Sequence, residues 1–136
     1  MNECTDKYLV DKYLGVPYKE RGRDITGYDC YGFIRDVARD LGVFLPDYEY
    51  DGNTNNVFAL NFADHLVPTT LPNSSFGDLI SFRMPNNSIH LGILLDRTRF
   101  IHCISKGGVQ VTRITHPIFI NRISGVYKFK RSAINE

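Results

Sequence analysis

Residues 27–42 read GYDCYGFIRDVARDLG. Apolar residues in this stretch recur every three or four positions and form one face, while the charged residues form the opposite face. The pattern predicts an amphipathic helix from Cys30 to Leu41, with Gly42 as its C-terminal stop. A glycine-containing turn, Gly27 to Asp29, comes directly before the helix, so a cysteine stands at its first position.

That position gives Cys30 a candidate chemical role. The N-terminus of a helix carries unpaired N–H groups and about half a positive charge. Such an environment stabilises a thiolate, the nucleophilic form of cysteine, and its N–H groups can hold an oxyanion during acyl transfer. The alternative reading is a small, buried and inert cysteine, the usual state of a free thiol in a core.

Helices dominate the first half of the chain. Thr5 is a candidate N-cap for a first helix that stops at Gly15. Residues 16–27 are expected to form a loop rich in glycine and charge, residues 45–56 a long connection, and residues 57–66 a third, shorter helix.

The second half changes to short apolar or β-branched runs separated by turn residues. Strands this close together pair antiparallel through hairpins. Helices followed by such a meander predict an α+β domain, with the helices packed on one face of the sheet. The expected strands are 78–82, 89–95, 100–105, 109–114 and 126–129.

Two histidines lie inside these strands, His90 in Ile-His-Leu and His102 in Ile-His-Cys. A three-residue loop at 96–98 would pair Leu95 with Arg99 and place both histidines on the same sheet face, one diagonal step apart. A base and a second polar group that orients it need this arrangement. A two-residue loop would separate the histidines, and two satisfied core histidines are the other alternative.

The same three side chains, Cys30, His90 and His102, could in principle hold a metal ion. Their separations lack the short paired spacing of structural zinc sites, so we expect neither a metal nor an organic cofactor.

The other candidate residues are predicted to be structural or superficial. Cys103 alternates away from His102 in its strand, so it should pack against the helices. Tyr18 could be a packing aromatic or could line a pocket. The rest are His65 on a surface helix, His116 in a turn and Cys4 near the terminus.

Composition limits the classes of function. The 136 residues are enough for one domain, 1–136, with its own core. Sixteen Lys and Arg against 15 Asp and Glu give a net charge of +1, which argues against a nucleic-acid partner. No apolar run approaches the roughly 20 residues of a membrane span, and the N-terminus lacks a signal-peptide pattern, so we expect folding in a cytoplasm. Three cysteines do not make a disulfide framework.

Six segments, in order, resemble the NlpC family of papain-like cysteine peptidases, which cut cell-wall peptides. The resemblance covers about residues 8 to 130 and implies an NlpC fold, with N-terminal helices on a central antiparallel sheet of five to six strands. The matching segments are 15–18 (GVPY), 28–33 (YDCYGF), 42–46 (GVFLP), 76–82 (FGDLISF), 90–93 (HLGI) and 100–103 (FIHC).

The resemblance also implies roles for individual residues. Cys30 would be the nucleophile, His90 the general base and His102 the third polar residue of the triad. Tyr18 would stand beside the oxyanion. Asp29 and the residue after the nucleophile would bind the amine end of the substrate, but that second residue is Tyr31 where the family commonly has Ser.

This departure, together with residues 45–48 (LPDY), resembles the phage-tail branch of the family. The implied function is a peptidoglycan endopeptidase acting on stem peptides, at the γ-D-glutamyl–diaminopimelate bond that the family favours. Phage tail-tip proteins are the implied partners, and a virion or the host cytoplasm during assembly is the implied location. Two alternatives stay open: a tail assembly component with little hydrolytic activity, and an acyltransferase or amidase on the same Cys–His scaffold.

Overall fold

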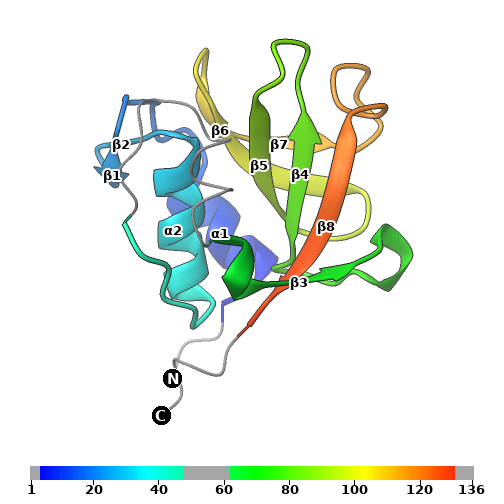
Figure 1. Cartoon of the computed structure of the whole chain (residues 1–136). Helices are drawn as coiled ribbons and strands as arrows, with labels where there is room; N and C mark the ends of the chain where they lie inside the picture. The colour runs from blue at the N-terminus through cyan, green and yellow to red at the C-terminus, as the bar shows by residue number, and fades with distance from the viewer. Residues whose placement is uncertain (1–3, 48–61, 131–136) are drawn as a thin grey trace.

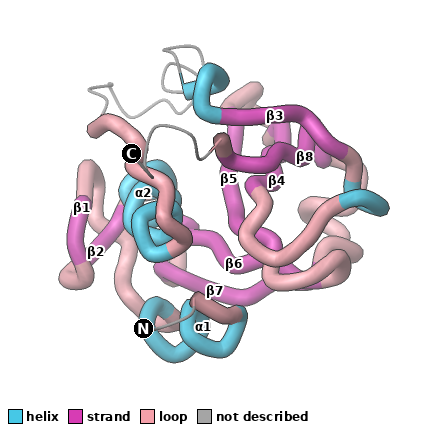
Figure 2. The backbone as a smooth tube through the Cα atoms, turned by 90° about the horizontal axis from the view of Figure 1, so that it is seen from below, coloured by secondary structure: helices cyan, strands magenta, loops and turns pink. Residues whose placement is uncertain are grey.

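The computed structural model describes residues 4–47 and 62–130. These residues form two α-helices and a six-stranded antiparallel sheet, with α1 and α2 together on one side of the sheet (Figure 1). Seen from below, α1 lies beside β7 and the sheet curls (Figure 2). No helix within these residues is long and apolar enough to cross a membrane.

The first two predicted helices are confirmed, with ends within about one residue of those expected. Helix α1 spans Asp6–Tyr13, and the Tyr8 N–H donates to the Thr5 hydroxyl, so Thr5 is its N-cap. Helix α2 spans Cys30–Asp40, and Gly42 follows it with a φ of 91°, a left-handed conformation that favours glycine. The prediction of a third helix over residues 57–66 is wrong for the residues that the structure describes, because a 3₁₀ turn, Phe62–His65, leads directly into a strand. Residues 57–61 lie outside the described residues.

All five predicted strands are present, with ends shifted by no more than three residues. The main sheet has the order β3-β8-β4-β5-β6-β7, with every neighbouring pair antiparallel. The sequence prediction missed β3 at the edge and a two-stranded ribbon, β1-β2, in the expected loop before α2. Their bounds are Arg23–Asp24 (β1), Gly27–Tyr28 (β2), Leu66–Thr69 (β3), Leu79–Arg83 (β4), Ile89–Leu94 (β5), Arg99–Ile104 (β6), Gly108–Arg113 (β7) and Ile123–Phe129 (β8).

The strand pleat divides the core into two clusters. On β5 and β6 the odd-numbered apolar residues pack with α2, as Leu91 and Ile101 do. Even-numbered residues on the same strands, such as Leu94 and Phe100, belong to a second cluster with Phe119. Since His90 and His102 are even-numbered, their rings lie on the sheet face that points away from the helices.

Candidate active site

Cys30 is the first residue of α2, and the residues around it fix the start of that helix. The Asp29 carboxylate accepts hydrogen bonds from the Gly32 N–H at 2.7 Å and from Arg23 Nη1 at 2.9 Å. A Cβ on Gly32 would lie 2.0 Å from the Gly22 carbonyl oxygen, so only glycine allows the first turn to sit this close to the β1 segment. The helix start is therefore held by a cap, an ion pair and close backbone packing.

The three-residue hairpin loop between β5 and β6 is confirmed. Leu94 pairs with Phe100, and the Leu95 N–H donates to the Arg99 carbonyl at 2.9 Å. In this register both histidines occupy one face, as predicted, and His90 Nε2 lies 2.7 Å from His102 Nδ1. The two rings meet nearly edge to face, with centroids 5.0 Å apart.

The nucleophile candidate joins this pair from the helix side. Cys30 Sγ lies 3.9 Å from His90 Nδ1 and 3.8 Å from the Leu91 carbonyl oxygen. The two nitrogens of His90 thus face different partners, sulfur on one side and the His102 ring on the other. This arrangement can pass a proton from the thiol to His90 while His102 holds the orientation of the ring.

An aromatic wall encloses the histidines. Phe119 stacks on His90 with centroids 5.9 Å apart and meets His102 edge-on at 5.3 Å. Phe100 lies against His102 at 4.4 Å, and Phe82 lies 6.3 Å from His90. These rings exclude water from His102, which is 0% exposed, whereas His90 also borders a cavity and is partly exposed.

Desolvation keeps both reacting groups neutral at rest. Burial raises the pKa of the Cys30 thiol to about 12 and lowers the pKa of His90 to about 4. Burial also lowers the pKa of His102 to about 3, and the neighbouring His90 adds to this effect. Burial of the sulfur therefore acts against the resting thiolate that the helix N-terminus was expected to stabilise. His90 is left as a neutral base facing an S–H group.

A cavity of about 350 Å³ opens beside the sulfur. Cys30, His90 and Tyr18 all line it, and Tyr18 is 37% exposed, so it is a pocket aromatic and not a core residue. Burial raises the pKa of Tyr18, so its hydroxyl stays protonated and can donate a hydrogen bond. The remaining lining residues are Met84, Asn86, Ser88, Ile89, Cys103, Ile104, Ser105 and Phe119.

Asp29 and Tyr31 lie behind this cavity and do not line it. Asp29 is 4% exposed and caps α2. Tyr31 is fully buried, its hydroxyl donates to the Pro46 carbonyl at 2.6 Å, and the Arg23 guanidinium lies 5.8 Å from its ring centroid. Both residues thus stabilise the position of α2. A substrate amine could bind them only by displacing their contacts with the Gly32 N–H and the Pro46 carbonyl.

The remaining predicted cysteines and histidines lie outside the reacting group. Cys103 is 1% exposed, packs in the cluster that contains α2, and its thiol donates to the Tyr28 carbonyl at 3.3 Å, as the alternation predicted. His116 lies in an exposed turn, also as predicted, and its Nδ1 accepts from the Ile118 N–H. Cys4 packs at the edge of the helical cluster, and His65 lies in the 3₁₀ turn before β3.

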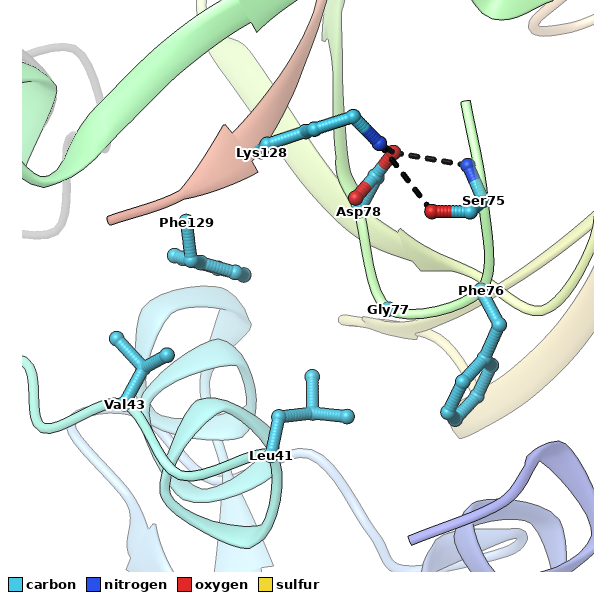
Figure 3. A pocket seen from close by; sticks show the side chains of 8 residues that line it. All are labelled: Leu41, Val43, Ser75, Phe76, Gly77, Asp78, Lys128 and Phe129. Atoms are coloured by element: carbon cyan, nitrogen blue, oxygen red, sulfur yellow. Dashed lines mark hydrogen bonds and ion pairs between the residues drawn. The ribbon is translucent and has the colours of Figure 1, made fainter. Parts of the chain in front are cut away.

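A second hollow, of about 340 Å³, lies at the opposite end of α2 (Figure 3). Its polar centre is Asp78, which accepts from Lys128 Nζ at 2.8 Å and from the Ser75 N–H at 2.9 Å. This hollow has neither a cysteine nor a histidine in its lining. The described residues also contain no group of three metal-binding side chains arranged around a common point. Of these two hollows, the cavity beside Cys30 is the one lined by both a thiol and an imidazole.

Sequence reasoning missed two residues of the site, Thr112 and Phe119. Thr112 Oγ1 lies 2.8 Å from His102 Nε2. Strand alternation carried one strand further, from β6 to β7, could have found Thr112, which pairs with Phe100 on the histidine face. Phe119 follows β7 in an irregular turn, where no periodic signal predicts the direction of a side chain.

The NlpC/P60 family model matches residues 15–128. Among curated proteins, the chain is 26% identical over 118 residues to the murein DD-endopeptidase MepS/murein LD-carboxypeptidase of Escherichia coli K12, with 84% of this chain and 57% of that protein covered. It is 28% identical over 109 residues to a probable endopeptidase of Haemophilus influenzae, with 78% of this chain and 62% of that protein covered. The chain thus spans only about six-tenths of the length of these relatives.

Solved structures show the same fold. An NlpC/P60 family protein from Bacillus cereus aligns with a TM-score of 0.71 at 21% identity, over 94% of this chain and 41% of that one. The NlpC/p60 domain of the peptidoglycan hydrolase SagA aligns with a TM-score of 0.65 at 21% identity, over 95% of this chain and 100% of that domain. Because the family model matches most of this chain and the fold is the same, the chain belongs to the NlpC/P60 family.

Proposed function

We propose that this protein is a cysteine peptidase that hydrolyses the peptide part of peptidoglycan. The observation that carries the proposal is the alignment of Cys30, His90 and His102, with Sγ to Nδ1 at 3.9 Å and Nε2 to Nδ1 at 2.7 Å, at the edge of an open cavity. The names of the E. coli relative and of the SagA domain support peptidoglycan as the substrate, and the name of the H. influenzae relative supports endopeptidase activity.

In the proposed acylation, the Cys30 thiol gives its proton to His90 Nδ1 as the sulfur attacks the carbonyl carbon of an amide. The carbonyl π electrons move to oxygen, and that oxyanion lies near the first turn of α2 and the Tyr18 hydroxyl. The oxyanion collapses, the C–N bond breaks, and His90 Nδ1–H protonates the leaving amine. A thioester on Cys30 remains.

Deacylation repeats these steps with water as the nucleophile. His90 Nδ1 takes a proton from water, the hydroxide oxygen bonds to the thioester carbon, and the C–S bond breaks. The proton returns to sulfur and a carboxylic acid product leaves. Throughout both halves His90 Nε2–H donates to His102 Nδ1, which keeps the ring directed at sulfur.

Within this function we propose the γ-D-glutamyl–diaminopimelate bond of the stem peptide as the bond cut, and residues 1–136 as one working domain. The SagA domain alignment, which covers that whole domain and 95% of this chain, supports the domain proposal. For Asp29 and Tyr31 we propose that any influence on the substrate passes through the position of α2, because both are engaged behind the cavity.

We also propose an association with a phage tail, with the enzyme made in a cytoplasm and carried to the wall. The support is Tyr31 after the nucleophile, with the 45–48 segment, both typical of that branch. Co-purification of this protein with tail-tip proteins from infected cells would support the association. Its absence both from such complexes and from assembled virions would contradict it.

The test of the peptidase is the incubation of purified muropeptides with the wild type and with Cys30→Ala, followed by product analysis. Hydrolysis by the wild type alone supports the proposal. Equal cleavage by both proteins removes Cys30 from the mechanism. A product joined to an added amine, without hydrolysis, would identify an acyltransferase on the same scaffold.

A further inference from the structure

The row of contacts from Cys30 through His90 to His102 continues by one more residue. Nε2 of His102 lies 2.8 Å from Thr112 Oγ1. Thr112 belongs to β7 and pairs with Phe100 across β6, so it reaches the histidine from the neighbouring strand on the same face. Four groups on three strands and one helix are thus joined in a row: Sγ of Cys30, the ring of His90, the ring of His102 and the hydroxyl of Thr112.

Counting protons in this row leaves two arrangements. A neutral imidazole carries one ring proton, on either nitrogen. In the first arrangement the S–H group faces His90 Nδ1, His90 Nε2–H donates to His102 Nδ1, and His102 Nε2–H donates to Thr112 Oγ1. In the second, every donor is reversed: Thr112 O–H donates to His102 Nε2, His102 Nδ1–H donates to His90 Nε2, and His90 Nδ1–H points at sulfur.

Only the first arrangement lets His90 act as a base toward Cys30. In the second, His90 Nδ1 already holds a proton and cannot accept the one on sulfur. Once His90 has taken that proton, both of its nitrogens are donors, and His102 must offer a lone pair at Nδ1. The single proton of His102 must then be on Nε2, where it needs an acceptor.

Thr112 is the polar side chain in the described residues that meets His102 Nε2. His102 itself is 0% exposed, and Phe100 and Phe119 pack against its ring. A buried Nε2–H group without an acceptor would be destabilised by the full desolvation of an N–H donor. Without the threonine oxygen, the tautomer that His90 requires would lose its stabilising contact.

We propose that Thr112 is a positioning residue, whose hydroxyl oxygen accepts the Nε2 proton of His102 and thereby holds Nδ1 of His102 as the acceptor for His90. Thr112 does not touch the substrate and acts through His102 alone. The inference deepens the proposed peptidase, but it concerns a tautomer that can be measured without any substrate.

The test is ¹⁵N NMR of histidine-labelled protein at pH 8, well above the lowered pKa values of His90 and His102. The expected wild-type spectrum has His102 protonated at Nε2 and unprotonated at Nδ1. Thr112→Val, which keeps the shape and removes the hydroxyl, should give a mixture of tautomers. Thr112→Ser should restore the wild-type pattern, and Thr115→Val, at an exposed site in the following turn, should leave it unchanged.

A second readout is the rate of Cys30 alkylation at neutral pH. Thr112→Val should react about tenfold more slowly than the wild type, because a misdirected general base loses part of its 10²- to 10⁴-fold contribution, whereas Thr112→Ser should stay within about twofold. A wild-type spectrum with His102 protonated at Nδ1 overturns the proposal even if Thr112→Val does not fold. An Nε2–H tautomer in a protein that cleaves no muropeptide would overturn the proposed function and leave this inference standing.

Discussion

Nδ1 of His90 lies 3.9 Å from Sγ of Cys30, although the two residues reach that point from opposite sides of the sheet. Cys30 belongs to the helix that covers one face, and His90 projects from the other. They meet near the start of β5, where Sγ also lies 3.8 Å from the Leu91 carbonyl oxygen. The reacting pair therefore depends on the packing of α2 against this end of the sheet.

The first prediction concerns the pH dependence of thiol reactivity. Alkylation of Cys30 by iodoacetamide should be flat across neutral pH and fall as the pH drops through about 4, where His90 becomes protonated. In His90→Ala the thiol has no base, and alkylation should rise only as the pH approaches its own pKa of about 12. Mass spectrometry of the Cys30 peptide measures both, with the Cys4 peptide as internal reference. Identical pH profiles for the two proteins would contradict the pairing.

The second prediction separates the orienting role of His102 from its packing. His102→Asn keeps a side-chain oxygen that can accept from His90 Nε2, whereas His102→Leu keeps bulk and loses the acceptor. Both should lower kcat, and His102→Leu should lower it by at least about tenfold more, because a general base held in the wrong orientation loses much of its 10²- to 10⁴-fold contribution. Equal rates for Asn and Leu at equal thermal stability would mean that His102 only fills space.

The third prediction concerns acid stability. The folded-state pKa values of His90 and His102 are lowered to about 4 and about 3, below the roughly 6.5 of an unfolded histidine. The unfolded chain therefore binds more protons between these values, so the free energy of unfolding should be at its full value above about pH 6.5 and fall as the pH drops through 4. His90→Gln should flatten the fall between pH 6.5 and 4, and an unchanged pH profile in this variant would contradict the prediction. Asp96 also contributes to the loss of stability below pH 4, because its folded-state pKa is lowered to about 2.

The fourth prediction concerns the start of α2. Asp29→Ala removes the N-cap and the ion pair between Asp29 and Arg23, so it should lower the free energy of unfolding by about 1–2 kcal/mol. Asp29→Asn keeps a capping oxygen and should cost less. Urea denaturation measures the difference. If Asp29 instead bound the substrate directly, both variants would raise KM without a change in stability.

The fifth prediction concerns Tyr31. Tyr31→Phe removes the hydrogen bond to the Pro46 carbonyl and should lower stability by about 1 kcal/mol while leaving KM unchanged. Tyr31→Ser would leave a cavity in the core and should cost several kcal/mol, as large-to-small aromatic substitutions do. A selective increase in KM for Tyr31→Phe would place the phenol in contact with substrate and contradict its buried position.

Much of the fold could be predicted because local signals and tertiary structure agree. The cap at Thr5, the apolar face of α2 and the three-residue turn after β5 each determine a local geometry that packing then preserves. The shared face of His90 and His102 followed from that turn, since strand alternation leaves no other choice once the register is set.

The missing parts depend on contacts between distant residues. Strand β3 contains Pro68 and pairs only at the sheet edge, so its short sequence lacks the alternation that predicts a strand. The ribbon β1-β2 is only two residues per strand. The thiolate expected at Cys30 rested on the helix alone, whereas burial of the sulfur raises the pKa of the thiol and depends on tertiary packing.

The most direct test of the central claim is mass spectrometry of purified muropeptides incubated with wild type, Cys30→Ala and Cys4→Ala. We predict cleaved stem peptides, each cut adding the mass of one water, with wild type and Cys4→Ala and intact muropeptides with Cys30→Ala. The same products from Cys30→Ala, or intact muropeptides with a folded wild type, would contradict a thiol peptidase of the cell wall.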